Sequence, residues 1–319
     1  MEPVPGSHLV SAEGPLMQAS FLARALLLSF TSALAACSGE SSNESDPDDW
    51  AGTGGTGASG GSGATGGSGA TAGTGAGPST SDELGTGTFA GVGASTERYY
   101  TASVQRDMIP YFLITNGWGP GFQSHGISWR GTSFIVENMA GTQGMNYEPA
   151  SYPSVFCGKY SIMQVPACGL PAAITSLGAV KTGWRWAPNG NAGSYNAAYD
   201  IWLGDGSQLQ SYLMVWLRDP PGAQPAGGRG AGGIAVANVP GTWNLWTGTV
   251  NGLPIVNYVR PEGADILEVE FNVLDFIADA KMRSLNLPGT HVNAVAIGFE
   301  IWSGPVTKLE TKDFYVHVE

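Results

Sequence analysis

The stretch SYLMVWL, Ser211 to Leu217, decides the fold of this chain. In an extended strand, successive side chains point to opposite faces. The alternation splits the stretch into an apolar set suited to a core and an aromatic-rich set on which a sugar ring can lie. The apolar set is Leu213, Val215 and Leu217, and the aromatic-rich set is Tyr212, Met214 and Trp216.

Two other stretches repeat this alternation, YNAAYDIWL at 195–203 and GFEIWSG at 298–304. Each places a carboxylate and a tryptophan on one face of an otherwise apolar strand. Acids are rarely tolerated in such runs unless they are paired or functional, so the alternative, a core with a few tolerated acids, is less favoured. The residues concerned are Asp200, Trp202, Glu300 and Trp302.

These strings resemble glycoside hydrolase family 12, and the resemblance covers roughly residues 98–319 in the right order. It implies an all-β fold, a two-sheet jelly-roll sandwich of the concanavalin A-like glucanase type. It also implies an open cleft and cleavage of β-1,4-glucan with retention. Its further motifs are NGWG at 116–119, SYPSVF at 151–156, Gln224-Pro225 and TWNLWTG from Thr242.

The resemblance assigns catalytic roles but leaves the catalytic pair incomplete. Retaining glycosidases need two carboxylates about 5–5.5 Å apart. Glu300 falls on the family's acid/base, and Asp200 falls on the residue that hydrogen-bonds the nucleophile. The nucleophile position, two residues before the Met of MVW, holds Tyr212, and no Asp or Glu lies between Asp205 and Asp219.

Three interpretations of Tyr212 remain open. The domain binds glucan without cutting it, or Tyr212 is itself a nucleophile with Asp200 as its base, or Asp200 activates water and the product is inverted. We favour a hydrolase by descent with weak or altered activity. The other function class is a non-catalytic, lectin-like surface lipoprotein that binds glucan.

Seven residues are expected to contact the glycan. The resemblance places Asn116 and Trp118 on a stacking platform remote from the cut bond, and Gln224 and Pro225 on a loop across one end of the cleft. The remaining three, Met214, Trp216 and Trp302, belong to the aromatic strand faces. Whether Trp184 and Trp186 extend the cleft or fill the core stays open.

Composition restricts the partners. The net charge of −12 and the pI near 4.7 argue against nucleic acid, whose phosphates require Lys and Arg. Ten tryptophans in a chain of low charge favour stacking on a neutral polysaccharide, a β-glucan or a related glycan. Because the four histidines are scattered, no metal site is expected. We also expect no cofactor and a monomer.

The N-terminal part resembles an export signal. An apolar run follows Arg24 and ends in Leu-Ala-Ala-Cys at 34–37, which resembles the lipobox of bacterial lipoproteins. The run is too short to span a bilayer. We therefore expect residues 1–36 to be an export signal, with Met17 as a candidate start, and Cys37 to carry a lipid anchor. This predicts an exported bacterial lipoprotein at the cell surface or outer membrane.

Residues 37–93 are predicted to form a disordered tether and residues 94–319 the hydrolase-like domain. The tether is rich in Gly, Ser, Thr and Ala, and it repeats GGSGAT twice from Gly60. Such a composition buries too little apolar surface to offset its ordering entropy. Beyond Cys37 only Cys157 and Cys168 remain, and in an exported protein we expect them to pair.

The domain itself contains many short apolar runs separated by Gly, Pro and Asn, as in an all-β sandwich. Five further runs are predicted to be strands, and Val273–Leu287 is predicted to be a single helix ended by Pro288-Gly289. The strands are Tyr111–Thr115, Ser133–Glu137, Gly183–Trp186, Gly233–Ala237 and Lys312–Val318.

Overall fold

The structure is a computed structural model that describes residues 83–144, 148–191 and 193–319. The export signal, Cys37 and the GGSGAT repeats lie outside the described residues. Among those that are described, no helix is long and apolar enough to cross a membrane.

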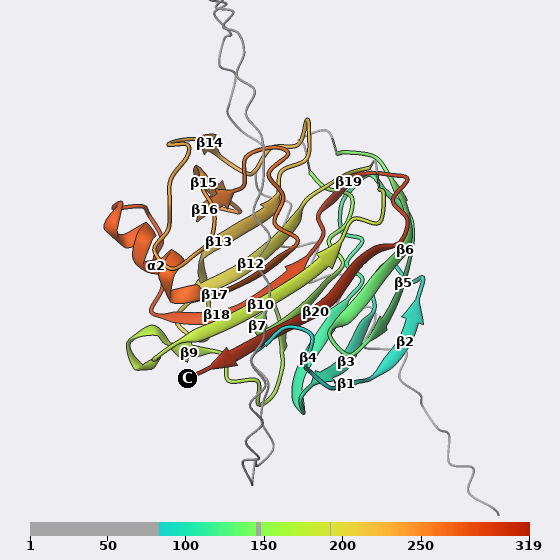
Figure 1. Cartoon of the computed structure of the whole chain (residues 1–319), viewed down its shortest axis with the longest axis horizontal. Helices are drawn as coiled ribbons and strands as arrows, with labels where there is room; N and C mark the ends of the chain where they lie inside the picture. Colours follow the sequence, from blue (N-terminus) through green and yellow to red (C-terminus); the bar gives the residue numbers. More distant parts are fainter. Residues whose placement is uncertain (1–82, 145–147, 192) are drawn as a thin grey trace, which may run out of the picture. The chain divides into compact units, whose positions relative to one another are not determined.

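Two β-sheets make up the described part of the chain (Figure 1). The larger sheet runs in the order β1-β3-β4-β7-β18-β12-β13-β16-β15-β14, with β8 paired to β7 and β9 paired to β18. The bounds are β1 (Phe89–Ala90), β3 (Thr101–Arg106), β4 (Ile109–Ile114), β7 (Ser154–Tyr160), β8 (Met163–Gln164), β9 (Ala172–Ala173), β12 (Ala197–Gly204), β13 (Leu209–Arg218), β14 (Gly228–Arg229), β15 (Asn244–Val250), β16 (Leu253–Val259) and β18 (His291–Gly298).

The smaller sheet runs in the order β17-β10-β20-β6-β5-β2, and a short ribbon of β11 and β19 stands apart from both sheets. Its strands are β2 (Val92–Ser95), β5 (Phe122–Arg130), β6 (Ser133–Gly141), β10 (Val180–Ala187), β17 (Glu268–Asn272) and β20 (Leu309–Val318). The ribbon pairs β11 (Ser194–Tyr195) with β19 (Ile301–Ser303). A short 3-10 helix covers Ile174–Ser176, and the α-helix α2 covers Val273–Met282.

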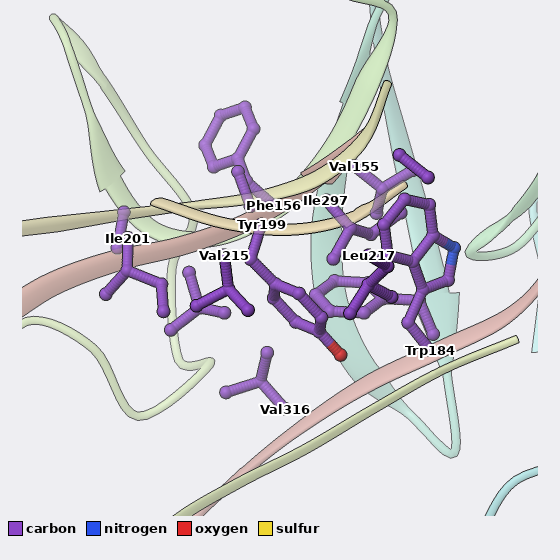
Figure 2. Close-up of a cluster of buried hydrophobic side chains, with 14 of the residues drawn as sticks. Val155, Phe156, Trp184, Tyr199, Ile201, Val215, Leu217, Ile297 and Val316 are labelled. Atoms are coloured by element: carbon purple, nitrogen blue, oxygen red, sulfur yellow. The ribbon is translucent and has the colours of Figure 1, made fainter. Parts of the chain in front are cut away.

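The core lies between the two sheets. Figure 2 shows Tyr199 and Val215 of the larger sheet beside Trp184 and Val316 of the smaller sheet, and these side chains belong to one buried cluster. The apolar set of SYLMVWL lies in the same cluster, whereas Met214 and Trp216 belong to a second one with Trp302. The predicted division of this strand into two faces is therefore confirmed.

The two carboxylate-bearing stretches are each interrupted where a single strand was predicted. Residues 195–203 divide into β11 and β12 at Asn196, and residues 298–304 divide at Phe299 and Glu300. The main-chain N–H of Asn196 donates to the carbonyl of Glu300 across this break. The alternation still holds, because Phe299 and Ile301 are buried in the core and Trp302 lies in the second cluster.

Two sequence predictions need correction. Gly233–Ala237 is not a strand, because only Ile234 bridges to Trp243. The helix ends at Met282 rather than at Leu287. Within the helix, Asp279 is buried, and its Oδ2 accepts hydrogen bonds from the Tyr258 hydroxyl at 2.8 Å and from Arg283 Nε at 2.7 Å.

The folded region begins before the predicted boundary at residue 94. Strands β1 and β2 pair with β3 and β5. Further upstream, the Gly85 N–H donates to Asp313 Oδ2 at 2.7 Å, and the Asp313 carboxylate also binds the buried Arg106 guanidinium. The charge pair Arg106–Asp313 therefore holds the start of the domain, which composition alone assigned to the tether.

The predicted disulfide between Cys157 and Cys168 is confirmed, with a Cα–Cα distance of 5.9 Å. Both residues are buried. The bond joins β7 to the loop that follows β8, and thereby ties that loop to the middle of the larger sheet.

Candidate active site

The candidate site lies on the outer face of the larger sheet, which we define as the face turned away from the smaller sheet. Strand β12 contributes Asp200 and Trp202 to it, and β13 contributes Tyr212 and Met214. In the antiparallel register, Asp200 is opposite Met214 and Trp202 is opposite Tyr212. Because side chains alternate along each strand, this register brings the four onto one surface.

Asp200 is the buried carboxylate of the site, with 8% of its surface exposed. Its Oδ2 accepts hydrogen bonds from the Tyr160 hydroxyl at 2.8 Å and from Trp202 Nε1 at 2.9 Å. Its Oδ1 is buried without a hydrogen-bond partner among the described residues. Burial raises the pKa of Asp200 to about 6, although the two donated hydrogen bonds oppose this shift.

Glu300 follows β18 and is held by Asn196. The Asn196 amide donates from Nδ2 to Glu300 Oε2 at 2.5 Å, and its Oδ1 accepts from the Glu300 N–H at 2.9 Å. Burial raises the pKa of the Glu300 carboxyl to about 8, the Asn196 hydrogen bond opposes the rise, and the charge of Asp200 adds to it. Glu300 is therefore protonated at neutral pH, the state that a general acid requires.

Tyr212 is half-buried, and the Asn251 side chain beside its hydroxyl lowers the pKa of the phenol. Its ring meets the Trp202 ring edge-on at 5.8 Å, and Trp202 stacks on Tyr160 at 4.1 Å. Burial and the charge of Asp200 raise the pKa of the phenol to about 12. The structure thus holds a neutral phenol at the position where the sequence resemblance expects a carboxylate.

Of the three tryptophans expected to stack on sugar, Trp118 is half-buried, whereas Trp216 and Trp302 are buried and present no open stacking surface. Trp216 and Trp302 are 1% and 2% exposed and pack against each other with ring centroids 5.5 Å apart. Met214 is buried beside them. Trp184 and Trp186, whose placement the sequence left open, are both buried in the core between the sheets.

Asn116 and Trp118 lie in the loop that follows β4, and both are half-buried. Asn116 has a φ of 44°, a left-handed conformation that asparagine tolerates better than most residues. Arg98 anchors the loop on both sides of Trp118, because its Nε donates to the Gly117 carbonyl at 2.5 Å and its Nη2 donates to the Gly119 carbonyl at 3.1 Å. The guanidinium also lies over the ring of Phe122.

The loop after β13 carries Gln224 and Pro225. Gln224 is exposed and Pro225 is buried. The carbonyl of the next residue, Ala226, accepts a hydrogen bond from Asn257 Nδ2 at 3.0 Å. Asn257 is opposite Met214 in the parallel pairing of β13 with β16, so this bond ties the loop to the outer face.

Sequence reasoning missed three residues that shape the site: Tyr160, Asn196 and Asn251. Tyr160 holds Asp200 from 40 residues away, and Asn196 holds Glu300 from 104 residues away, separations that no local pattern encodes. For Asn251 a signal existed, because the Asn251-Gly252 dipeptide between two strand-like runs is typical of a tight hairpin. Among the described residues, no cluster of three or more His, Cys, Asp or Glu is placed to hold a metal ion.

Several known endoglucanases are similar to this chain. A xyloglucan-specific endo-beta-1,4-glucanase A from Aspergillus niger is 25% identical over 151 residues, which cover 46% of this chain and 61% of that protein. Endoglucanase S from Pectobacterium parmentieri is 26% identical over 214 residues, covering 61% of this chain and 76% of that protein. The solved endoglucanase cel12A from Rhodothermus marinus has a TM-score of 0.62 at 28% identity, covering 71% of this chain and 98% of that one.

The fold of a solved relative and a family model both bear on the family to which this chain belongs. The solved structure is a two-sheet jelly roll, as the sequence predicted for this chain. The model of glycosyl hydrolase family 12 matches residues 110–319, which include β12, β13 and Glu300. This chain belongs to glycosyl hydrolase family 12.

Proposed function

We propose that this chain acts on β-1,4-glucan, of cellulose or xyloglucan type, with Glu300 as the group that protonates the leaving glycosidic oxygen. The observation that carries the proposal is the Glu300 carboxyl itself, fixed by Asn196 and protonated at neutral pH. Proton donation to the leaving group is half of glycoside hydrolysis. The names of the relatives support the substrate class.

The other half of the chemistry is altered, because Tyr212 occupies the nucleophile position. A phenol with a pKa near 12 is a poor nucleophile unless a base takes its proton. Asp200 is not positioned as that base in the described part of the chain, because its Oδ2 is engaged by Tyr160 and Trp202 and no hydrogen bond joins its Oδ1 to the Tyr212 hydroxyl. We therefore propose weak or altered hydrolysis.

The second candidate function is non-catalytic binding of glucan at a cell surface. The observation that favours it is the same neutral Tyr212, which leaves Glu300 without a second reactive carboxylate. In this version Asn116, Trp118 and the loop at Gln224 and Pro225 bind glycan, and the Gly-rich segment holds the domain away from the membrane.

Release of reducing ends from soluble β-glucan and from xyloglucan separates the two functions. Slow turnover that Glu300→Gln abolishes supports the hydrolase, and Glu268→Gln, an exposed glutamate on β17, is the matched control that keeps activity. Binding of the same polymers without any turnover supports the binding protein. Wild-type turnover that Glu300→Gln leaves intact contradicts the role given to Glu300.

We also propose that the chain is an exported bacterial lipoprotein anchored through Cys37. The support is the sequence of residues 17–37, with its apolar run and lipobox. Replacing Cys37 with Ser should move the protein from the detergent phase to the aqueous phase in phase partitioning. Unchanged partitioning would contradict the anchor without affecting the proposed glucan chemistry.

A further inference from the structure

Tyr212 differs from Met214 and Trp216, the next two residues on its strand face, in remaining partly exposed. The ring projects from the middle of β13 on the outer face, opposite Trp202 on one side and Ile255 on the other. The neighbours on this face, Met214 and Trp216, are buried, whereas Tyr212 stays partly exposed. A ligand lying on the outer face can therefore reach Tyr212.

The orientation of the ring is fixed by an aromatic row. Tyr212 meets Trp202 edge-on at an interplanar angle of 89°, Trp202 stacks on Tyr160, and Tyr160 packs on Phe156 with centroids 5.0 Å apart. Trp202 is itself fixed by its hydrogen bond to Asp200. Because edge-on and stacked contacts depend on geometry, this row restricts the rotamers of Tyr212.

The tip of the β15–β16 hairpin lies beside the hydroxyl. Asn251 and Gly252 form that tip with φ values of 53° and 78°, the left-handed pair of a tight two-residue turn. The Asn251 side chain lowers the pKa of the phenol, which is the effect of an amide N–H that faces the phenol oxygen. In that arrangement the phenol proton is left to donate to another acceptor.

The surroundings make this phenol a hydrogen-bonding group rather than a reacting one. Its pKa of about 12 keeps it protonated at any physiological pH. The neighbouring Asp200 carboxylate is engaged by Tyr160 and Trp202 on one oxygen, and among the described residues no hydrogen bond joins the other oxygen to the Tyr212 hydroxyl. A tyrosyl nucleophile would need that carboxylate to accept its proton.

We propose that Tyr212 is a non-covalent glucan-binding residue. Its ring is fixed by Trp202, and its hydroxyl, which lies beside Asn251, donates a hydrogen bond to a sugar oxygen where the family places its nucleophile. This inference rests on the proposed function, since it takes β-1,4-glucan as the ligand. It makes Asn251 a positioning residue that acts through Tyr212.

Calorimetric titration of the full chain with cellotetraose and with a xyloglucan oligosaccharide tests the inference. Tyr212→Phe, which removes only the hydroxyl, should weaken binding about threefold to tenfold, the range expected for one hydrogen bond. Asn251→Ala should weaken it by a similar or smaller factor, and should add nothing when combined with Tyr212→Phe. Tyr100→Phe, an exposed tyrosine elsewhere, is the control that should bind as wild type does.

Covalent labelling supplies the second arm. A 2-deoxy-2-fluoro-cellobiosyl fluoride traps a retaining nucleophile, because the attacking oxygen bonds to the anomeric carbon as fluoride leaves and the 2-fluoro group slows hydrolysis of the product. We expect intact-mass spectrometry to show no adduct on the wild type. An adduct on the peptide that contains Tyr212 would make it a nucleophile and overturn the inference.

The binding data also separate this inference from the proposed function. If the wild type binds both oligosaccharides and Tyr212→Phe binds them equally well, the role given to Tyr212 is wrong and the glucan assignment stands. If the wild type binds neither oligosaccharide, the glucan assignment is wrong, and this inference, which depends on it, is wrong as well. Circular dichroism of each variant should match the wild type, because the hydroxyl lies outside the core cluster.

Discussion

Asn196, at the break between β11 and β12, and Glu300, at the break between β18 and β19, are joined by three hydrogen bonds. The Asn196 amide donates to Glu300 Oε2 at 2.5 Å and accepts from the Glu300 N–H at 2.9 Å, while the Asn196 N–H donates to the Glu300 carbonyl at 2.9 Å. The main chain and the carboxyl of Glu300 are thus fixed by one partner. This arrangement holds the Glu300 carboxyl, the proposed proton donor, in one orientation.

Removing the Asn196 side chain should raise the pKa of Glu300 above its value near 8, because the donated hydrogen bond favours the carboxylate. The measurement is a carbon NMR titration of the Glu300 carboxyl in Asn196→Ala and in the wild type, which does not depend on turnover. Asn191→Ala, on a neighbouring loop, is the control. A pKa that falls in Asn196→Ala would show that the amide does not stabilise the carboxylate.

Glu300→Gln should stabilise the fold at pH 8 and have little effect at pH 4. The unfolded carboxyl loses its proton near its ordinary pKa of 4.5, whereas the folded one keeps it to about 8. Unfolding therefore releases a proton between these values, and stability falls as the pH rises through that window. At pH 8 we expect the free energy of unfolding of Glu300→Gln to exceed that of the wild type by about 1–3 kcal/mol, a figure discounted for the partial exposure of Glu300.

Thermal unfolding followed at pH 4, 6 and 8 measures this gain. Both proteins keep Asp200, whose raised pKa of about 6 adds a pH dependence of its own to each. Glu268→Gln, at an exposed position, should show no such pH-dependent gain. Equal stability of Glu300→Gln and the wild type at every pH would mean that the carboxyl titrates normally.

Tyr212→Glu should raise hydrolysis of soluble β-1,4-glucan well above the wild type. The substitution places a carboxylate on β13 near Asp200, whose Oδ1 is without a hydrogen-bond partner in the described structure. Glu300 is the proposed proton donor. Two carboxylates acting together are what retention requires. Adding Glu300→Gln to Tyr212→Glu should abolish the gain, and NMR of the first product should show the retained anomer.

The outcomes of that experiment are distinct. A wild type that is already fast, and that Tyr212→Glu slows, would give Tyr212 a catalytic role of its own. If Tyr212→Glu and its combination with Glu300→Gln are both inactive, restoring one carboxylate is not enough for hydrolysis. The non-catalytic binding protein is then the better description.

Trp118→Ala should weaken glucan binding by about 1–3 kcal/mol, taking the stacking of bases on aromatic side chains as a guide to magnitude. The ring sits in a loop anchored on both sides by Arg98, so its position is defined before the ligand arrives. Trp129→Phe, on the smaller sheet, serves as a control. Equal affinities of Trp118→Ala and the wild type in calorimetry would place Trp118 outside the binding surface.

The sequence by itself determined which residues share a strand face and which cysteines pair. The period of two in SYLMVWL fixed Leu213 and Val215 in the core and Tyr212 on the outer face, because a one-residue shift would bury the wrong set. The helical spacing of apolar residues after Asn272 likewise predicted the helix, and the Asn272 side chain accepts a hydrogen bond from the Leu274 N–H at its start. These features follow from local geometry, which neighbouring residues encode.

Tertiary structure decided what surrounds each reactive group. Trp216 and Trp302 belong to different strands, and only their contact made them a buried pair rather than open stacking surfaces. Burial set the raised pKa values of Asp200 and Glu300, which depend on every segment packed around them. The partners Tyr160, Asn196 and Asn251 reach the site from distant parts of the chain, and single-strand patterns carry no information about such contacts.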